Sequence, residues 1–107
     1  MAFRNYGIAF SSGLAATNAI IQTLDKSDHV LCIDDVYGGT QRLFRKIVAP
    51  NSGIEFDFTD MTDPAAVVAA IKPNTKMIWI ESPTNPTLKI TDIAAVAAAV
   101  RAIRDNV

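Results

Sequence analysis

The chain has 107 residues, half of them apolar, and its ten basic and eleven acidic residues leave a net charge of −1. This length matches one domain, and the apolar content favours a buried core over disorder. A charge so close to zero excludes a general electrostatic attraction to nucleic acid or to an anionic membrane. The single cysteine, Cys32, has no internal disulfide partner, which indicates a small buried side chain and a reducing, cytoplasmic setting.

Four short apolar runs have the length of β-strands: "YGIAF" at 6–10, "HVLCI" at 29–33, "IEFDF" at 54–58 and "KMIWI" at 76–80. Helical patterns follow them at 14–24, at 40–48, after Asp63-Pro64 and after Thr91-Asp92. A strand followed by a helix, four times over, predicts an α/β fold. We expect a three-layer structure with a parallel sheet, alternating βα units and right-handed crossovers.

The loops after the four runs are the candidate site, because ligands of open parallel sheets bind beyond the carboxyl ends of the strands. These loops read "SSGLAAT", "DDVYGGT", "TDMTD" and "ESPTNPT". Three of them carry more glycine, proline and polar side chains than a plain connection needs. Since all four are predicted at one edge of the sheet, we expect them to form a single binding site.

The first loop places Ser11, Ser12 and Gly13 at the start of a helix. Free backbone N–H groups and the positive end of the helix dipole favour an anion there, and Gly13 lets it approach closely. The spacing matches neither a dinucleotide-binding motif nor a P-loop, so a single phosphate fits best. A serine N-cap beside a permissive glycine is the structural alternative.

In the second loop, Tyr37 precedes two glycines that allow a tight turn. Its ring can stack on a flat ligand, and its hydroxyl can act in acid–base chemistry, although a half-buried cap on the sheet is the alternative. Asp34 and Asp35 lie just before it. They suggest a metal site, but we favour one loop cap and one solvated carboxylate, and we predict no metal.

The last loop restricts its backbone twice, because residues before proline avoid the helical region. Glu81 and Asn85 are thereby held in fixed directions, where Asn85 can donate to a ring oxygen and Glu81 can orient a neighbour. The sequence leaves open whether the Ser82-Pro83 or the Asn85-Pro86 bond is cis. The loop predicts a rigid shelf of polar contacts to a ligand.

Together, "AFSSGLAAT", "DDVYGGTQRLFRK" and "WIESPTNPTLKITDI" resemble the pyridoxal-phosphate-dependent enzymes of cysteine and methionine metabolism, of cystathionine γ-lyase type. The resemblance covers nearly the whole chain from about Gly7 onward. It implies the aspartate-aminotransferase fold (fold type I) and pyridoxal 5′-phosphate as cofactor. It also implies that residues 1–107 are part of the large cofactor-binding domain, without the N-terminal arm and the C-terminal half.

The resemblance also implies roles for particular residues. Ser12, Gly13 and Leu14 match the helix start whose backbone N–H groups hold the cofactor phosphate. Tyr37 matches the tyrosine that stacks on the pyridine ring and handles protons, and it is the one predicted catalytic residue. Asn85 matches the asparagine near the phenolic oxygen of the cofactor, and Glu81 matches the glutamate that lines the pocket beside it.

The implied reaction is γ-elimination of L-cystathionine, a small amino-acid substrate, to cysteine, 2-oxobutanoate and ammonia. The full-length enzyme is expected to be a cytoplasmic homotetramer, with no nucleic acid and no membrane as partner. The family's cofactor-binding lysine has no match here, nor has the aspartate that pairs with the pyridine nitrogen. We therefore expect the isolated chain to be inactive, and neither Lys76 nor Lys89 to replace that lysine.

Three other interpretations remain open from the sequence. The chain is a segment of a cystathionine γ-synthase, or a non-catalytic binding module derived from the same fold, or a generic mononucleotide binder that uses Ser11 to Gly13. The last of these leaves Tyr37 and the "SPTNP" segment unexplained.

Overall fold

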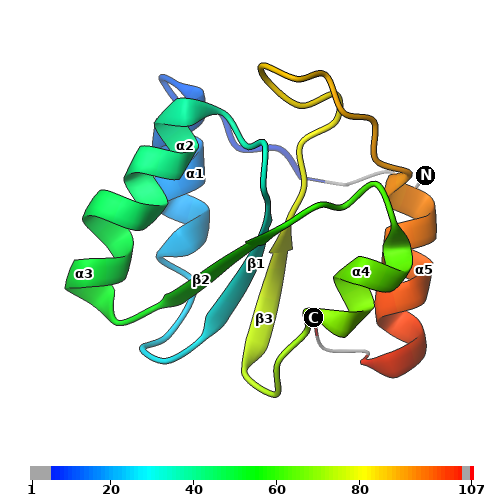
Figure 1. Cartoon of the computed structure of the whole chain (residues 1–107). Helices are drawn as coiled ribbons and strands as arrows, with labels where there is room; N and C mark the ends of the chain where they lie inside the picture. Colours follow the sequence, from blue (N-terminus) through cyan, green and yellow to red (C-terminus); the bar gives the residue numbers. More distant parts are fainter. Residues whose placement is uncertain (1–5, 105–106) are drawn as a thin grey trace.

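The computed structural model describes residues 6–104 and residue 107 (Figure 1). Three strands, β1 (His29–Ile33), β2 (Glu55–Thr59) and β3 (Thr75–Trp79), form a parallel sheet in the order β2-β1-β3. One face carries α1 (Gly13–Ile21), α2 (Gly38–Arg42), η1 (Leu43–Val48) and α3 (Ala49–Ser52), and the other carries α4 (Pro64–Ala69) and α5 (Ile93–Ile103). The predicted three-layer α/β architecture is confirmed.

The prediction of a strand at 6–10 is wrong, because these residues adopt no regular structure. A strand is stabilised by backbone hydrogen bonds to a neighbouring strand. Both sides of the central strand β1 are already occupied, by β2 and by β3. The outer sides of β2 and β3 pair with no strand among the described residues, but residues 6–10 join neither, and Tyr6 and Ile8 remain 91% and 83% exposed. An apolar run of this length predicts a strand only where a partner edge lies within reach.

The helix starts follow the capping chemistry that the sequence predicts. Ser12, Asp63 and Asp92 are the N-caps of α1, α4 and α5, and each side chain accepts a backbone N–H from the first turn at 2.9 to 3.1 Å. Pro64 begins α4, where its missing N–H leaves no bond unmade. Within the described residues no helix is long and apolar enough to cross a membrane.

The helix predicted at 40–48 is longer in the structure, since α2, η1 and α3 follow one another without a break. Its middle section, η1, has the wider π-helical turn. Pro50 lies in the first turn of α3 and has no N–H to donate, which interrupts the regular ladder of hydrogen bonds. The segment ends at Gly53, whose φ of 74° favours glycine.

The core is built around β1, whose five residues are all fully buried. The ring of Phe44 stacks on Phe56 of β2 at 4.7 Å and meets Trp79 of β3 edge-on at 5.5 Å, so one side chain links both outer strands. Cys32 is buried as predicted. Burial raises the pKa of its thiol to about 12, so the thiol stays protonated at neutral pH.

His29, at the amino end of β1, has a structural position in the core. Its Nδ1 lies 2.7 Å from the Thr75 hydroxyl oxygen, and its Nε2 lies 3.3 Å from a carboxylate oxygen of Asp57. Asp57 is also paired with Lys72 at 2.6 Å. Burial lowers the pKa of His29, and the Lys72 charge lowers it further, against the opposing effect of Asp57.

We expect the free energy of unfolding to fall as the pH drops below about 6.5, the ordinary pKa of histidine. His29 is the only histidine of the chain. Because its pKa is lowered in the folded state, the unfolded chain takes up a proton in this range that the folded chain does not. The loss cannot exceed about 1.4 kcal/mol per pH unit, the limit for one proton.

Urea unfolding at about pH 7.5 and about pH 5.5 measures this loss, with His29→Gln as the variant that has no imidazole to titrate. The urea concentration at the midpoint should be lower at about pH 5.5 than at about pH 7.5 for the wild type, and it should be the same at both pH values for the variant. Equal falls in both proteins would show that another group titrates.

Candidate functional site

The carboxyl ends of the three strands meet at one edge of the sheet, which lies at the top in Figure 1. The loops after β1, β2 and β3 leave from this edge, and α1 begins beside it. A cavity of about 390 Å³ opens between the starts of α1 and α2 and the end of β3. Its lining residues are Ser12, Gly13, Leu14, Thr17, Tyr37, Thr40 and Glu81.

Five of the six predicted site residues line this cavity, and Asn85 does not. Asn85 is exposed in the loop after β3. Thr17 and Thr40 also line the cavity but were not among the predicted site residues. For Thr17 the signal was its spacing, since it lies one helical turn after Gly13 and donates its hydroxyl to the Gly13 carbonyl at 2.9 Å.

The start of α1 is shaped to receive an anion. Ser12 Oγ accepts the N–H of Ala15 at 3.1 Å, so Ser12 is an N-cap, which is the structural role considered for it above. The N–H groups of Gly13 and Leu14 have no partner within the helix, because the first four N–H groups of a helix precede its first turn of bonds. A Cβ added at Gly13 would meet nothing within 4 Å, so this backbone is open to approach.

Tyr37 is held at the cavity through its backbone. Its N–H donates to Glu81 Oε2 at 2.9 Å, and the other carboxylate oxygen of Glu81 accepts the indole N–H of Trp79 at 3.2 Å. The Tyr37 ring lies against Gly39, where an added Cβ would be 2.5 Å from ring atom Cε1 and 3.3 Å from Leu14 Cδ1. Glu81 thus orients its neighbour as predicted, and a glycine at 39 makes room for the ring.

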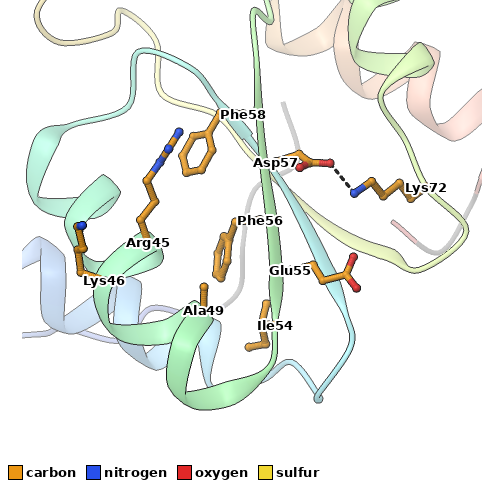
Figure 2. A pocket seen from close by; sticks show the side chains of 9 residues that line it. All are labelled: Arg45, Lys46, Ala49, Ile54, Glu55, Phe56, Asp57, Phe58 and Lys72. Carbon is orange, nitrogen blue, oxygen red and sulfur yellow. Dashed lines mark ion pairs between the residues drawn. The ribbon is translucent and has the colours of Figure 1, made fainter.

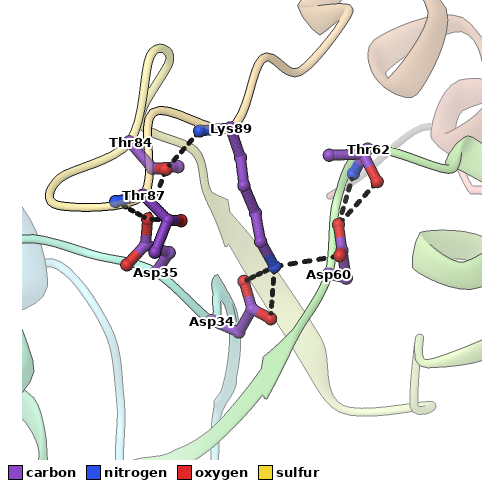
Figure 3. Close-up of polar contacts among 7 residues, drawn as sticks. All are labelled: Asp34, Asp35, Asp60, Thr62, Thr84, Thr87 and Lys89. Atoms are coloured by element: carbon purple, nitrogen blue, oxygen red, sulfur yellow. Dashed lines mark hydrogen bonds and ion pairs between the residues drawn. The ribbon is translucent and has the colours of Figure 1, made fainter.

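A lysine joins the loops at the same edge (Figure 3). Lys89 Nζ lies 2.9 and 3.1 Å from the two carboxylate oxygens of Asp34 and 2.9 Å from Asp60 Oδ2. These two carboxylates raise the pKa of Lys89. The Thr62 N–H and hydroxyl, followed by Lys89, lower the pKa of Asp60 to about 2. Lys89 is therefore protonated, and its ion pairs connect the loop after β3 to those after β1 and β2.

Asp35 bonds to different partners from those of Asp34. Its Oδ2 accepts the Thr84 hydroxyl at 2.5 Å, the Thr87 N–H at 2.9 Å and the Thr87 hydroxyl. One of the two acids was predicted to cap the loop, and this is Asp35. The other, Asp34, is exposed but is paired with Lys89 and not simply solvated. Among the described residues, no three histidine, cysteine or acidic side chains gather as a metal site would require.

The loop after β3 is closed by its own backbone. Thr84 N–H donates to the Lys89 carbonyl at 3.0 Å, and Leu88 N–H donates to the Thr84 carbonyl at 3.2 Å. Both the Ser82-Pro83 and the Asn85-Pro86 bonds are cis. These contacts agree with the rigid shelf that the two prolines predict.

A larger cavity of about 760 Å³ lies along β2, away from this edge (Figure 2). It is lined by Arg45, Lys46, Ala49, Ile54, Glu55, Phe56, Asp57, Phe58 and Lys72. Arg45 lies over the Phe58 ring at 4.1 Å, and Lys72 is paired with Asp57. None of the predicted site residues lines it, so the chemistry of the loops points to the smaller cavity.

Comparison with known proteins gives the family. Residues 2–107 match the family described as Cys/Met metabolism PLP-dependent enzyme. The chain belongs to this family. Its fold and its dependence on pyridoxal phosphate agree with the resemblance of the three loop motifs.

Three relatives illustrate the range of the match. A Caenorhabditis elegans protein whose name includes "cystathionine gamma-lyase 2" is 62% identical over 87 residues, which are 81% of this chain and 22% of that protein. A Herpetosiphon aurantiacus protein whose name includes "cystathionine gamma-synthase" is 52% identical over a stretch that covers 90% of this chain and 30% of that protein. The cystathionine beta-lyase of Coxiella burnetii is 45% identical over a stretch that covers 94% of this chain and 27% of that protein.

A solved structure shows the same arrangement. The crystal structure of metB from Corynebacterium glutamicum superposes with a TM-score of 0.87 at 46% identity, over 92% of this chain and 26% of that one. The chain thus spans less than a third of the length of each relative and structure it matches here.

The residues around the smaller cavity fit pyridoxal phosphate. The open backbone of Gly13 and Leu14 offers two N–H donors to a phosphate at the positive end of a nine-residue helix. The space left by Gly39 lets an aromatic face lie beside those donors. The cavity therefore pairs an anion site with a stacking surface, as a flat phosphorylated ring requires.

We expect Gly39→Ala to weaken binding of pyridoxal phosphate by roughly 2- to 10-fold, the range that corresponds to one stacking contact. The new Cβ would collide with the Tyr37 ring, which is half exposed and can move away. Gly38→Ala is the matched control, because its Cβ meets only Arg42 Nη1 at 3.5 Å. Titration followed by tryptophan fluorescence measures both. Equal effects of the two substitutions would contradict the stacking position of the ring.

We expect Lys89 to form no specific covalent adduct with pyridoxal phosphate, because its ion pairs with Asp60 and Asp34 keep the amine protonated. Borohydride reduction followed by peptide mapping tests this. Exposed Lys76 serves as the internal comparison and should be labelled no less than Lys89. Stoichiometric labelling of either lysine would show that it replaces the family's missing lysine.

Proposed function

We propose that this chain is a segment of a pyridoxal-phosphate-dependent transsulfuration enzyme of cystathionine γ-lyase type. The proposed reaction is γ-elimination of L-cystathionine to cysteine, 2-oxobutanoate and ammonia. One observation carries the proposal: a single cavity joins the start of α1, the Tyr37 ring and Glu81. The 62% identity to a relative named for this lyase activity supports the γ-lyase type.

Each residue of the cavity has a role in this proposal. The Gly13 and Leu14 N–H groups, after the Ser12 cap, hold the phosphate. Tyr37 stacks on the pyridine ring, and its hydroxyl moves a proton at the substrate amine. Glu81 fixes the Tyr37 backbone. Bound pyridoxal phosphate supplies an electron sink for carbanion chemistry.

Asn85 is proposed to contact the cofactor, although it does not line the cavity. The amide donates a hydrogen bond to the phenolic oxygen of the ring. We further propose that the full-length enzyme is a cytoplasmic homotetramer, as the resemblance implies. Turnover is proposed to need more than these 107 residues, since the family's cofactor-binding lysine has no match among them.

A γ-synthase is the nearest second candidate, favoured by the relative at 52% identity that carries that name. The two activities differ in substrate, since a γ-synthase performs a γ-replacement on an activated homoserine. Assaying cystathionine cleavage against cystathionine formation separates them. A non-catalytic binding module predicts cofactor affinity with neither reaction.

The role of Tyr37 can be tested in a chimera in which these residues replace the matching segment of the cystathionine gamma-lyase from Lactobacillus plantarum, which is 47% identical. We expect Tyr37→Phe to keep most of the cofactor affinity, because phenylalanine preserves a stacking interaction of about 0.5–1.5 kcal/mol. Turnover should drop by roughly 10² or more, because the acid–base hydroxyl is lost.

Tyr37→Ala should lose both cofactor affinity and turnover. If Tyr37→Phe turns over like wild type, the hydroxyl has no catalytic role. If Tyr37→Ala also binds the cofactor normally, Tyr37 is only a cap on the sheet. An inactive chimera with intact cofactor binding would favour the non-catalytic module.

A further inference from the structure

The turn that contains Asn85 is held by a residue from a distant part of the chain. Thr84 and Thr87 flank this turn, and both bond to Asp35, which lies 49 and 52 residues earlier, just beyond β1 (Figure 3). Asp35 does not line the cavity at the start of α1. Its carboxylate is directed at the turn.

The geometry fixes the turn on both sides of Asn85. On one side, Thr84 is only 1% exposed, donates its hydroxyl to Asp35 and accepts the Lys89 N–H at 2.8 Å. On the other side, Thr87 donates both its N–H and its hydroxyl to the same carboxylate oxygen. A residue held at both flanks loses little conformational freedom when it meets a ligand, so its contact contributes more affinity.

The charge of Asp35 strengthens these bonds. The hydroxyls of Thr84 and Thr87 lower the pKa of Asp35, so the carboxylate is ionised at neutral pH. Hydrogen bonds to an ionised acceptor are stronger than bonds between neutral groups. The same charge repels an anionic ligand, so a purely electrostatic effect of removing it would tighten the binding of a phosphate.

We propose that Asp35 is a positioning residue, which acts through Thr84 and Thr87 to hold Asn85 against the bound cofactor. This inference rests on the proposed function, which supplies the cofactor contact of Asn85. Positioning and electrostatics predict opposite signs for the loss of the Asp35 charge, and this difference makes the inference testable.

The test titrates the 107-residue chain with pyridoxal phosphate and follows the fluorescence of Trp79, the only tryptophan. We expect Asn85→Ala to weaken binding about 10-fold, the effect of losing one hydrogen bond to a charged group. Asp35→Asn should weaken binding by a similar factor. The double variant should lose no more than either single variant, because Asp35 acts through Asn85.

Asp34→Asn is the matched control. It removes the same charge from the neighbouring position, but Asp34 contacts Lys89 Nζ and not the turn. Binding by this variant should be unchanged or slightly tighter. A loss equal to that of Asp35→Asn would overturn the inference, because any charge at this edge would then have the same effect.

Amide hydrogen exchange supplies a readout without cofactor. In Asp35→Asn the Thr87 N–H should lose protection, because its acceptor is weakened, whereas Asn85→Ala and Asp34→Asn should leave it protected. Unchanged protection in Asp35→Asn would overturn the inference. If Asp35→Asn fails to fold, Thr87→Val is the second variant, because it removes one donor to Asp35 at an exposed position. It should weaken binding, and combining it with Asn85→Ala should weaken binding no further than Asn85→Ala alone.

The failures of the two proposals are distinguishable. Absence of binding by the wild-type chain would overturn the proposed function together with the positioning role that rests on it. Binding by wild type, with equal or tighter binding by Asp35→Asn, would overturn the positioning role alone.

Discussion

The parallel pairing of β1 with both of its neighbours determines where the polar groups of the loops after the strands lie. Ile33 is level with Thr59, and Cys32 is level with Trp79, so the three strands end at nearly the same height. The residues that follow these ends are therefore neighbours in space. Because of this alignment, Lys89 can reach Asp34 and Asp60 together, and Glu81 can accept hydrogen bonds from both Tyr37 and Trp79.

The two edges of the sheet use similar chemistry for different purposes. At the amino edge, Lys72 pairs with Asp57 beside the buried ring of His29, and the cluster completes the core. At the carboxyl edge, Lys89 pairs with Asp34 and Asp60, and these pairs are no more exposed than that of Lys72 with Asp57. The two clusters differ in what the charged pair contacts, since Asp57 lies against the fully buried ring of His29, whereas Lys89 connects the loops that follow the three strands.

Local patterns predicted the helix caps, three of the strands and most of the cavity, because each depends on residues close together in the sequence. The run at 6–10 was wrong because a strand also needs a partner, which no local pattern reports. The partners of Asp35 and Lys89 were missed for a similar reason. They lie 29 to 55 positions away and meet only because the strands align.

The order of strands along the chain has a consequence for synthesis on the ribosome. The central strand β1 emerges first, and its neighbours β2 and β3 follow later. Each new strand therefore adds to a free side of a strand that already exists, and none has to insert between two that have paired. Since proteins are made from the amino end and begin to fold as they emerge, this sheet can grow outward from its centre while translation continues.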